Sequence, residues 1–315
     1  MAKNKASEPP DTASPAERAR GVYADLATPR RADSTEADAA AFLDYLDYVA
    51  RAGSEGARVD GLVLFGSTGE FIHFDVAERM RAAALAIRRS RVPVLIGVSH
   101  STLVGALELA EHAIGIKASG VLLMPPYFYS YPEDQVFHFY DRFARDLGGE
   151  TSIYLHNSAL SANPMSPELI RRLLETGAFA GVVNEQGAGL AAATANAHSM
   201  LGVDEALVSS SEFVTDIVSG IAAALPELPV ALQRVLVLGQ RERHEELGRH
   251  LRELQSRLIA FPAVIALKHA AIARGWMSAH FAVPPDPAME ARLRAFREWF
   301  TEWLPGVLFK CATKG

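Results

Sequence analysis

Short apolar segments alternate with longer amphipathic segments along the chain from Gly21 onward. The amphipathic segments have helical periodicity and predict helices over residues 36–51, 76–89, 102–114, 133–147, 167–175 and 188–200. The apolar segments do not alternate with polar positions, so they are predicted to be strands buried on both faces of a parallel sheet. They span residues 22–28, 61–65, 94–98, 120–124, 152–156, 180–184, 205–209 and 216–220.

Strands that alternate with helices predict parallel pairing through crossover helices. Eight such units favour an α/β fold that closes into a (β/α)8 TIM barrel over an open doubly wound sheet. Residues 230–305 continue with helical periodicity and several prolines, which predicts about three additional C-terminal helices. The expected organisation is a disordered extension over residues 1–20, the barrel over 21–228 and a C-terminal helical region over 229–315.

Composition narrows the possible partners. Hydrophobic residues make up 49% of the 315 residues, which is ample for a packed core, and the formal net charge of -6 argues against nucleic acid or an anionic membrane as a partner. Cys311 is the only cysteine, so we expect no internal disulfide and a cytoplasmic location. The first twenty residues lack the apolar core of a signal peptide, and the sequence contains no apolar segment suited to span a membrane.

Active sites of such barrels form at the C-terminal ends of the strands. Gly66, Ser67, Thr68, Gly69 and Glu70 follow the second apolar segment directly. The glycines permit a tight turn, and the hydroxyl and amide groups can then face an anion such as a carboxylate. The same residues also occur in plain strand-to-helix turns, so the pattern by itself leaves both interpretations open.

Residues 61–81 resemble the signature of the dihydrodipicolinate synthase / N-acetylneuraminate lyase family, in which this loop binds the carboxylate of pyruvate. Residues 21–29, 120–144, 220–228 and 261–276 resemble further parts of that family, so the resemblance extends from Gly21 to about Pro305. It implies a TIM barrel, a lyase of the class I aldolase type and a small carboxylate-bearing ligand. It also implies a homodimer or homotetramer, for which the aromatic segment 127–131 is a candidate interface.

The resemblance breaks down where the family carries its catalytic lysine, which forms a Schiff base with a keto acid. The family pattern Gly-x-Lys-[Glu/Asp]-x-x-Gly corresponds to Gly181–Gly187, and the two glycines place Val183 at the lysine position. His156 stands where the family has its proton-transferring tyrosine, and Asn157 is shared with the family. An imine requires a primary amine, so the resemblance predicts an atypical member without Schiff-base chemistry.

The candidate catalytic residues are therefore His156, whose ring can act as an acid or a base near neutral pH, and Glu185 as its partner. A hydrogen-bonded pocket histidine and a solvated glutamate at a helix start are the alternative interpretations. Tyr127 either lines the pocket or packs between subunits. The candidate substrate-binding residues are Gly66, Ser67, Thr68, Gly69, Tyr127 and Asn157.

No metal and no cofactor are predicted. His100, His156 and Glu185 could approach one another, but no closely spaced ligand pair supports a metal site. No glycine-rich dinucleotide fingerprint follows the first strand.

Three functions remain open: a lyase that acts on a small keto or hydroxy acid without an imine, a non-catalytic carboxylate-binding or regulatory protein, and an ordinary pyruvate aldolase whose lysine lies elsewhere. The positions of the lysines disfavour the third.

Overall fold

The computed structural model describes residues 21–32, 34, 36–53, 58–158, 160–186, 198–209 and 216–312, and the predicted N-terminal extension lies outside these residues. The strands are β1 (Val22–Leu26), β2 (Gly61–Leu64), β3 (Val94–Gly97), β4 (Gly120–Leu123), β5 (Ile153–Asn157), β6 (Gly181–Asn184), β7 (His198–Leu201) and β8 (Ile217–Ser219). The α-helices between strands are α1 (Ala39–Arg51), α2 (Val76–Arg89), α3 (Leu103–Gly115), α4 (Glu133–Leu147), α5 (Pro167–Glu175) and α6 (Ala206–Ser209). Two short 3-10 helices, η2 (Phe71–His73) and η3 (Ile221–Ala223), follow β2 and β8.

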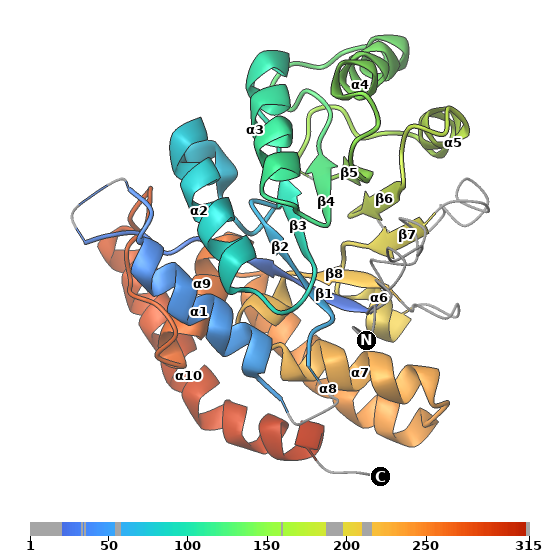
Figure 1. The fold of residues 1–315 in the computed structure, drawn as a ribbon. Helices are drawn as coiled ribbons and strands as arrows, with labels where there is room; N and C mark the ends of the chain where they lie inside the picture. The colour runs from blue at the N-terminus through green and yellow to red at the C-terminus, as the bar shows by residue number, and fades with distance from the viewer. Residues whose placement is uncertain are drawn as a thin grey trace, which may run out of the picture.

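The eight strands are parallel and close into a barrel in sequential order, with β8 pairing back to β1 (Figure 1). This confirms the predicted TIM barrel. Inside the barrel, one buried layer contains one side chain from every strand: Tyr23, Val63, Leu95, Leu122, Tyr154, Val183, Met200 and Val218. Because side chains alternate along a strand, residues two positions after this layer face inward at the C-terminal end of the barrel.

The seventh βα unit differs from the prediction. A strand was expected over residues 205–209 and a helix over 188–200, but the strand is His198–Leu201 and residues 206–209 form α6, while 188–197 lie outside the described residues. The sequence of β7 is short and half polar, so it lacks the apolar run that marks the other strands. Its buried His198 is accommodated because Nε2 lies 3.0 Å from Oδ2 of Asp216, next to β8.

The other predicted helices agree with the structure, and α2, α4 and α5 have the predicted bounds. Local capping explains the bounds of α2 and α5: Asp75 and Glu78 form a reciprocal capping box at the start of α2, and Ser166 caps α5, whose first residue is Pro167. The first helix begins at Ala39 rather than at residue 36, because the side chain of Asp38 caps it.

Four helices follow β8: α7 (Glu227–Val237), α8 (Arg241–Leu258), α9 (Ala263–Ala273) and α10 (Pro287–Ala312). The first of them packs against β1 and completes the helical layer, and the other three are the additional C-terminal helices (Figure 1). No helix in the described ranges combines the length and the apolar character needed to cross a membrane.

Candidate active site

The loop Gly66–Glu70 leaves the C-terminal end of β2 in a constrained conformation. The residues at its two borders, Phe65 (φ 58°) and Glu70 (φ 52°), both adopt the left-handed region that non-glycine residues rarely occupy. A Cβ atom on Gly66 would lie 2.4 Å from Oδ1 of Asp25, and one on Gly69 would lie 2.7 Å from the backbone of Phe65. The two glycines are therefore required by close approach, and the loop stores backbone strain of the kind found at functional sites.

The carboxylate of Glu185 lies at the centre of a hydrogen-bonded network formed by the ends of β2, β5 and β6. Ser67 donates its hydroxyl to Oε1 of Glu185 (2.6 Å), and Ser158 donates to Oε2 (2.6 Å). Nε2 of His156 lies 2.9 Å from Oε1 of Glu185 and 3.4 Å from the Ser67 hydroxyl. The structure thus brings together three of the sequence-predicted site residues and adds Ser158.

The environment of Glu185 favours its ionised form. Burial by itself would raise the pKa of this carboxyl, but the adjacent His156 and the hydrogen bonds from His156, Ser158 and Ser67 lower the pKa to about 2. This carboxylate lies 2.9 Å from Nε2 of His156 and fixes the orientation of the imidazole ring.

Asp25, near the end of β1, is a site residue that the sequence analysis missed. It lies two positions after Tyr23, so it faces the inside of the barrel, and Oδ2 accepts the backbone N–H of Thr68 at 2.7 Å. Burial raises the pKa of Asp25 to about 7 against the lowering effect of the Thr68 hydrogen bonds, and the charge of Glu185 raises it further. Oδ1 is buried and has no hydrogen-bond partner among the described residues.

Two predicted binding residues are engaged elsewhere. Asn157 is buried and donates its side-chain amide to Oδ1 of Asn184 (2.8 Å), while its own Oδ1 accepts the N–H of Met165 (2.8 Å). Asn157 therefore links β5 to β6 and to the segment before α5. Tyr127 packs edge-on against Phe71 of η2, with ring centroids 5.6 Å apart.

His100 lies outside this network. Its Nδ1 is 3.0 Å from the hydroxyl of Thr102 instead. Of the three residues considered for a metal site, the structure thus brings together only His156 and Glu185.

Val183 is fully buried inside the barrel, in the same layer as Tyr154 and Met200. Among the described lysines, Lys268 of α9 is buried and forms an ion pair with Glu70, the last residue of the loop. Lys117 lies in the turn before β4, at the opposite rim, and Lys310 of α10 pairs with Glu246 of α8 (2.5 Å).

Sequence comparisons connect most of the chain to one protein family. The family model "Dihydrodipicolinate synthetase family" matches residues 20–300. The chain is 35% identical over 118 residues to "Probable 2-dehydro-3-deoxy-D-pentonate aldolase YjhH" of Escherichia coli K12, a match that covers 36% of this chain and 38% of that protein. It is 32% identical over 165 residues to "Uncharacterized DapA-like lyase" of Thermococcus onnurineus, covering 52% of this chain and 54% of that protein. These matched stretches span less than two thirds of either relative.

Solved structures share the fold along nearly the whole chain. The 4-hydroxy-tetrahydrodipicolinate synthase of Methylacidiphilum fumariolicum SolV superimposes with a TM-score of 0.81 at 21% identity, covering 92% of this chain and 99% of that one. YagE from E. coli K12, in complex with pyruvate, gives a TM-score of 0.78 at 23% identity, covering 91% and 98%. Since the family model matches far more than half of its residues, the chain belongs to the dihydrodipicolinate synthetase family.

Proposed function

We propose that this protein is a lyase that acts on a small keto or hydroxy acid by acid–base catalysis, without a Schiff base. The observation that carries the proposal is the network in which His156, Glu185 and Ser67 meet at the C-terminal end of the barrel, with Val183 below them. Names of relatives such as "2-dehydro-3-deoxy-D-gluconate/2-dehydro-3-deoxy-phosphogluconate aldolase" of Picrophilus torridus suggest hydroxylated 2-keto acids as first substrates to test.

Two groups supply the proton transfers. In the cleavage direction, His156 accepts the proton of the substrate hydroxyl, and the carboxylate of Glu185 stabilises the imidazolium that forms. The carbon–carbon bond next to this hydroxyl then breaks, the hydroxyl carbon becomes an aldehyde, and the electron pair moves to the keto group, which becomes an enolate. Asp25, with a pKa of about 7, is largely protonated in mildly acidic solution and donates its proton to the oxygen that gains negative charge. A pair of carboxyl groups whose environments separate their pKa values is a common acid–base arrangement.

The carboxylate of the ligand is proposed to bind at the loop Gly66–Gly69, where Ser67 and Thr68 provide hydroxyl and amide groups. In the free protein the Ser67 hydroxyl donates to Glu185 and the Thr68 amide donates to Asp25. Ligand binding at the loop therefore requires an exchange of hydrogen-bond acceptors. The second candidate function is a non-catalytic carboxylate-binding or regulatory protein, and the buried, apolar Val183 at the position of the family's lysine favours it.

Release of a keto acid from 2-dehydro-3-deoxy-D-gluconate and 2-dehydro-3-deoxy-D-pentonate tests the proposal. His156→Phe and Asp25→Asn are each expected to lower kcat/KM by about 10²-fold or more, since general acid–base groups contribute on that scale. His100→Phe is the matched control, because the His100 ring bonds Thr102 outside the network. The activity should fall as pH rises through about 7, where Asp25 loses its proton.

The outcomes separate the two candidates. Turnover that survives in His156→Phe would contradict the proposed roles. Saturable binding of these acids without any turnover in the parent protein would favour the non-catalytic protein.

A further inference from the structure

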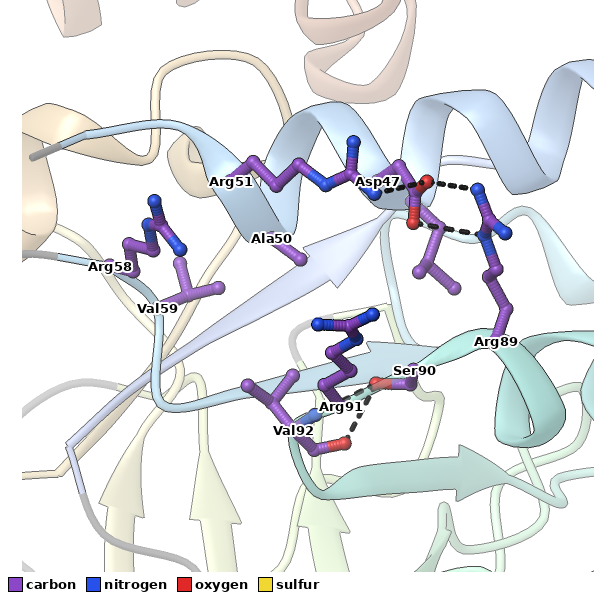
Figure 2. A pocket seen from close by; sticks show the side chains of 10 residues that line it. Asp47, Ala50, Arg51, Arg58, Val59, Arg89, Ser90, Arg91 and Val92 are labelled. Atoms are coloured by element: carbon purple, nitrogen blue, oxygen red, sulfur yellow. Dashed lines mark hydrogen bonds and ion pairs between the residues drawn. The ribbon is translucent and has the colours of Figure 1, made fainter. Parts of the chain in front are cut away.

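A pocket lined by four arginines lies at the end of the barrel opposite the candidate active site. Its walls come from the C-terminal half of α1, the C-terminal end of α2 and the segments that lead into β2 and β3 (Figure 2). Its volume is about 220 Å³. The strands are parallel, so residues just before β2 and β3 lie at the N-terminal rim, whereas the candidate active site lies at the C-terminal rim.

The charge of this pocket is opposite to that of the whole chain. The four lining arginines, Arg51, Arg58, Arg89 and Arg91, face a single lining carboxylate, Asp47, in a protein whose formal net charge is -6. A cationic cluster on an acidic protein concentrates anions locally.

Both carboxylate oxygens of Asp47 already accept hydrogen bonds from two of these arginines. Arg89 binds it with two nitrogens, Nε to Oδ1 (3.2 Å) and Nη2 to Oδ2 (2.5 Å), and Arg51 adds a contact to Oδ2 (3.1 Å). Figure 2 shows this pairing along one wall of the pocket, with Arg91 extending from the other wall toward α1. Asp47 thus fixes Arg51 and Arg89 and leaves their charge only partly compensated.

Favourable interaction with a helix C-terminus accounts for only two of the four arginines. Arg51 and Arg89 lie in the last turns of α1 and α2, where a cation offsets the partial negative charge of about half an elementary charge at a helix C-terminus. Arg58 and Arg91 lie outside the helices, and the described part of the chain offers neither of them a carboxylate within ion-pair distance. Two guanidinium groups therefore remain available to a ligand.

The shape of the pocket indicates the size and the chemistry of the ligand. Its floor is apolar, formed by Leu46, Ala50, Val59 and Val92. Guanidinium forks match the oxygen geometry of phosphate and carboxylate groups, and phosphate carries close to two charges at neutral pH. The volume is smaller than the roughly 300–1,000 Å³ of pockets for drug-sized molecules.

We propose that this pocket binds a small phosphate monoester, with the phosphate held by Arg58 and Arg91 and the carbon skeleton against the apolar floor. The proposal is independent of the function proposed for the other end of the barrel. The protein would then have a second ligand site, whose ligand is a small phosphorylated metabolite.

Calorimetric titration of the full chain at low ionic strength tests the proposal, with glycerol 3-phosphate, inorganic phosphate and glycerol as probes. We expect saturable one-to-one binding of glycerol 3-phosphate with a Kd below about 1 mM, weaker binding of inorganic phosphate and none of glycerol. Arg58→Ser and Arg91→Ser should each weaken binding about tenfold, the scale of one charge-assisted hydrogen bond. Absence of saturable binding by the parent protein overturns the proposal, and equal affinities for the ester and inorganic phosphate overturn the assignment of an ester.

The matched controls are the single variants Arg142→Ser and Arg145→Ser on α4, each of which removes one charge from an exposed arginine elsewhere. These controls should bind glycerol 3-phosphate like the parent protein. An equal loss of affinity in the controls and in the pocket variants would show binding by overall charge and would overturn the site. Ala50→Glu, which places a carboxylate in the pocket without removing an arginine, should also abolish binding and serves if the serine variants do not fold.

Discussion

At the scale of single residues, the distinctive feature is a pair of carboxyl groups whose pKa values are shifted in opposite directions. The pKa of Asp25 is raised to about 7 by burial and that of Glu185 is lowered to about 2 by His156 and three hydrogen bonds, although both face the same end of the barrel. Ser67 and Thr68 are neighbours in the loop and contact one carboxyl group each. Two adjacent loop residues thus contact two carboxyl groups with very different pKa values.

The protonation of Asp25 predicts how stability depends on pH. Its pKa rises from 3.8 to about 7 on folding, so the folded chain binds this proton more tightly than the unfolded chain, and stability falls as pH rises from about 4 to about 7. Asp25→Asn keeps a neutral group of the same shape. The variant should match the parent at pH 4 and exceed it by about 2–4 kcal/mol at pH 8. Urea unfolding at both pH values checks this, and a gap that does not change with pH would refute it.

The contribution of Glu185 to stability depends on pH in the opposite direction. Its pKa falls from 4.5 to about 2 on folding, so it contributes stability that is present above about pH 4.5 and is lost as pH falls through about 2. Glu185→Gln should therefore be less stable than the parent at pH 7 by about 1–3 kcal/mol, and the difference should narrow at pH 3. Thermal unfolding at the two pH values measures the difference. A deficit that is equal at both would show that the charge of Glu185 is not what stabilises the fold.

At the scale of elements, the sequence predicted those strands and helices whose local signals agree with their packing. β2 to β6 are apolar runs in a buried layer, and α2 and α5 carry N-terminal caps at their starts. β7 was missed because His198 and Ser199 break the apolar pattern, and the strand depends on pairing with β6 and on the contact with Asp216. Residues 206–209 form a short helix, in line with the helix propensity of Ala206 and Leu207, and the prediction was wrong because a short apolar run does not distinguish a strand from a helical turn.

Arg79 connects α2 to the end of β3, so we expect its substitution to lower the stability of the protein strongly. Its buried guanidinium donates to the carbonyl oxygens of Ser99 (2.8 Å) and Gly97 (2.7 Å) and lies over the ring of Phe65, which borders the loop. Arg79→Met would leave two buried carbonyl groups unsatisfied and should cost about 2–4 kcal/mol of unfolding free energy. Arg81→Met, on the exposed face of the same helix, should change stability by less than about 0.5 kcal/mol. Similar losses in both variants, measured by urea unfolding, would contradict this role.

At the scale of the whole molecule, the sequence predicted at which end of the barrel the candidate site lies. It predicted only some of the residues that form the site. The resemblance and the strand order predicted that Ser67, His156 and Glu185 could meet, and they do. Asp25 was missed because it stands inside an apolar run, although an acid at an inward-facing strand position was a usable signal. The actual contacts of Asn157 could not be predicted, because its partners come from two other segments.

The predicted oligomer is tested at the aromatic segment between β4 and α4. Phe128 is 77% exposed and Tyr129 is 66% exposed, a large apolar surface for a segment that belongs to a stable barrel. Phe128→Ser combined with Tyr129→Ser should shift the mass in light scattering from a dimer or tetramer toward the 34.0 kDa of one chain. Ile259→Ser, at an isolated exposed position after α8, is the control and should leave the mass unchanged. A parent protein that is already monomeric at micromolar concentration would contradict the prediction.

The final prediction concerns the chemistry available to the molecule: we expect no covalent adduct with pyruvate. An imine needs a neutral primary amine beside the bound keto acid, and the corresponding strand position holds Val183, which is buried and apolar. Among the described lysines, Lys268 contacts the loop, but its ammonium group forms an ion pair with Glu70. Incubation with pyruvate and borohydride, followed by intact-mass measurement, should give no stoichiometric mass increase.

An adduct that Lys268→Met abolishes would identify that lysine as the nucleophile and would contradict the mechanism without an imine. The complementary variant, Val183→Lys with His156→Tyr, places an amine inside the barrel and a phenol next to it. Burial lowers the pKa of such a lysine and keeps part of it neutral. We expect this double variant to gain the adduct that the parent lacks, because strand pairing sets Val183 directly opposite His156. If it folds and still forms none, the loop does not hold pyruvate near β6, and the proposed carboxylate site at Gly66–Gly69 is wrong.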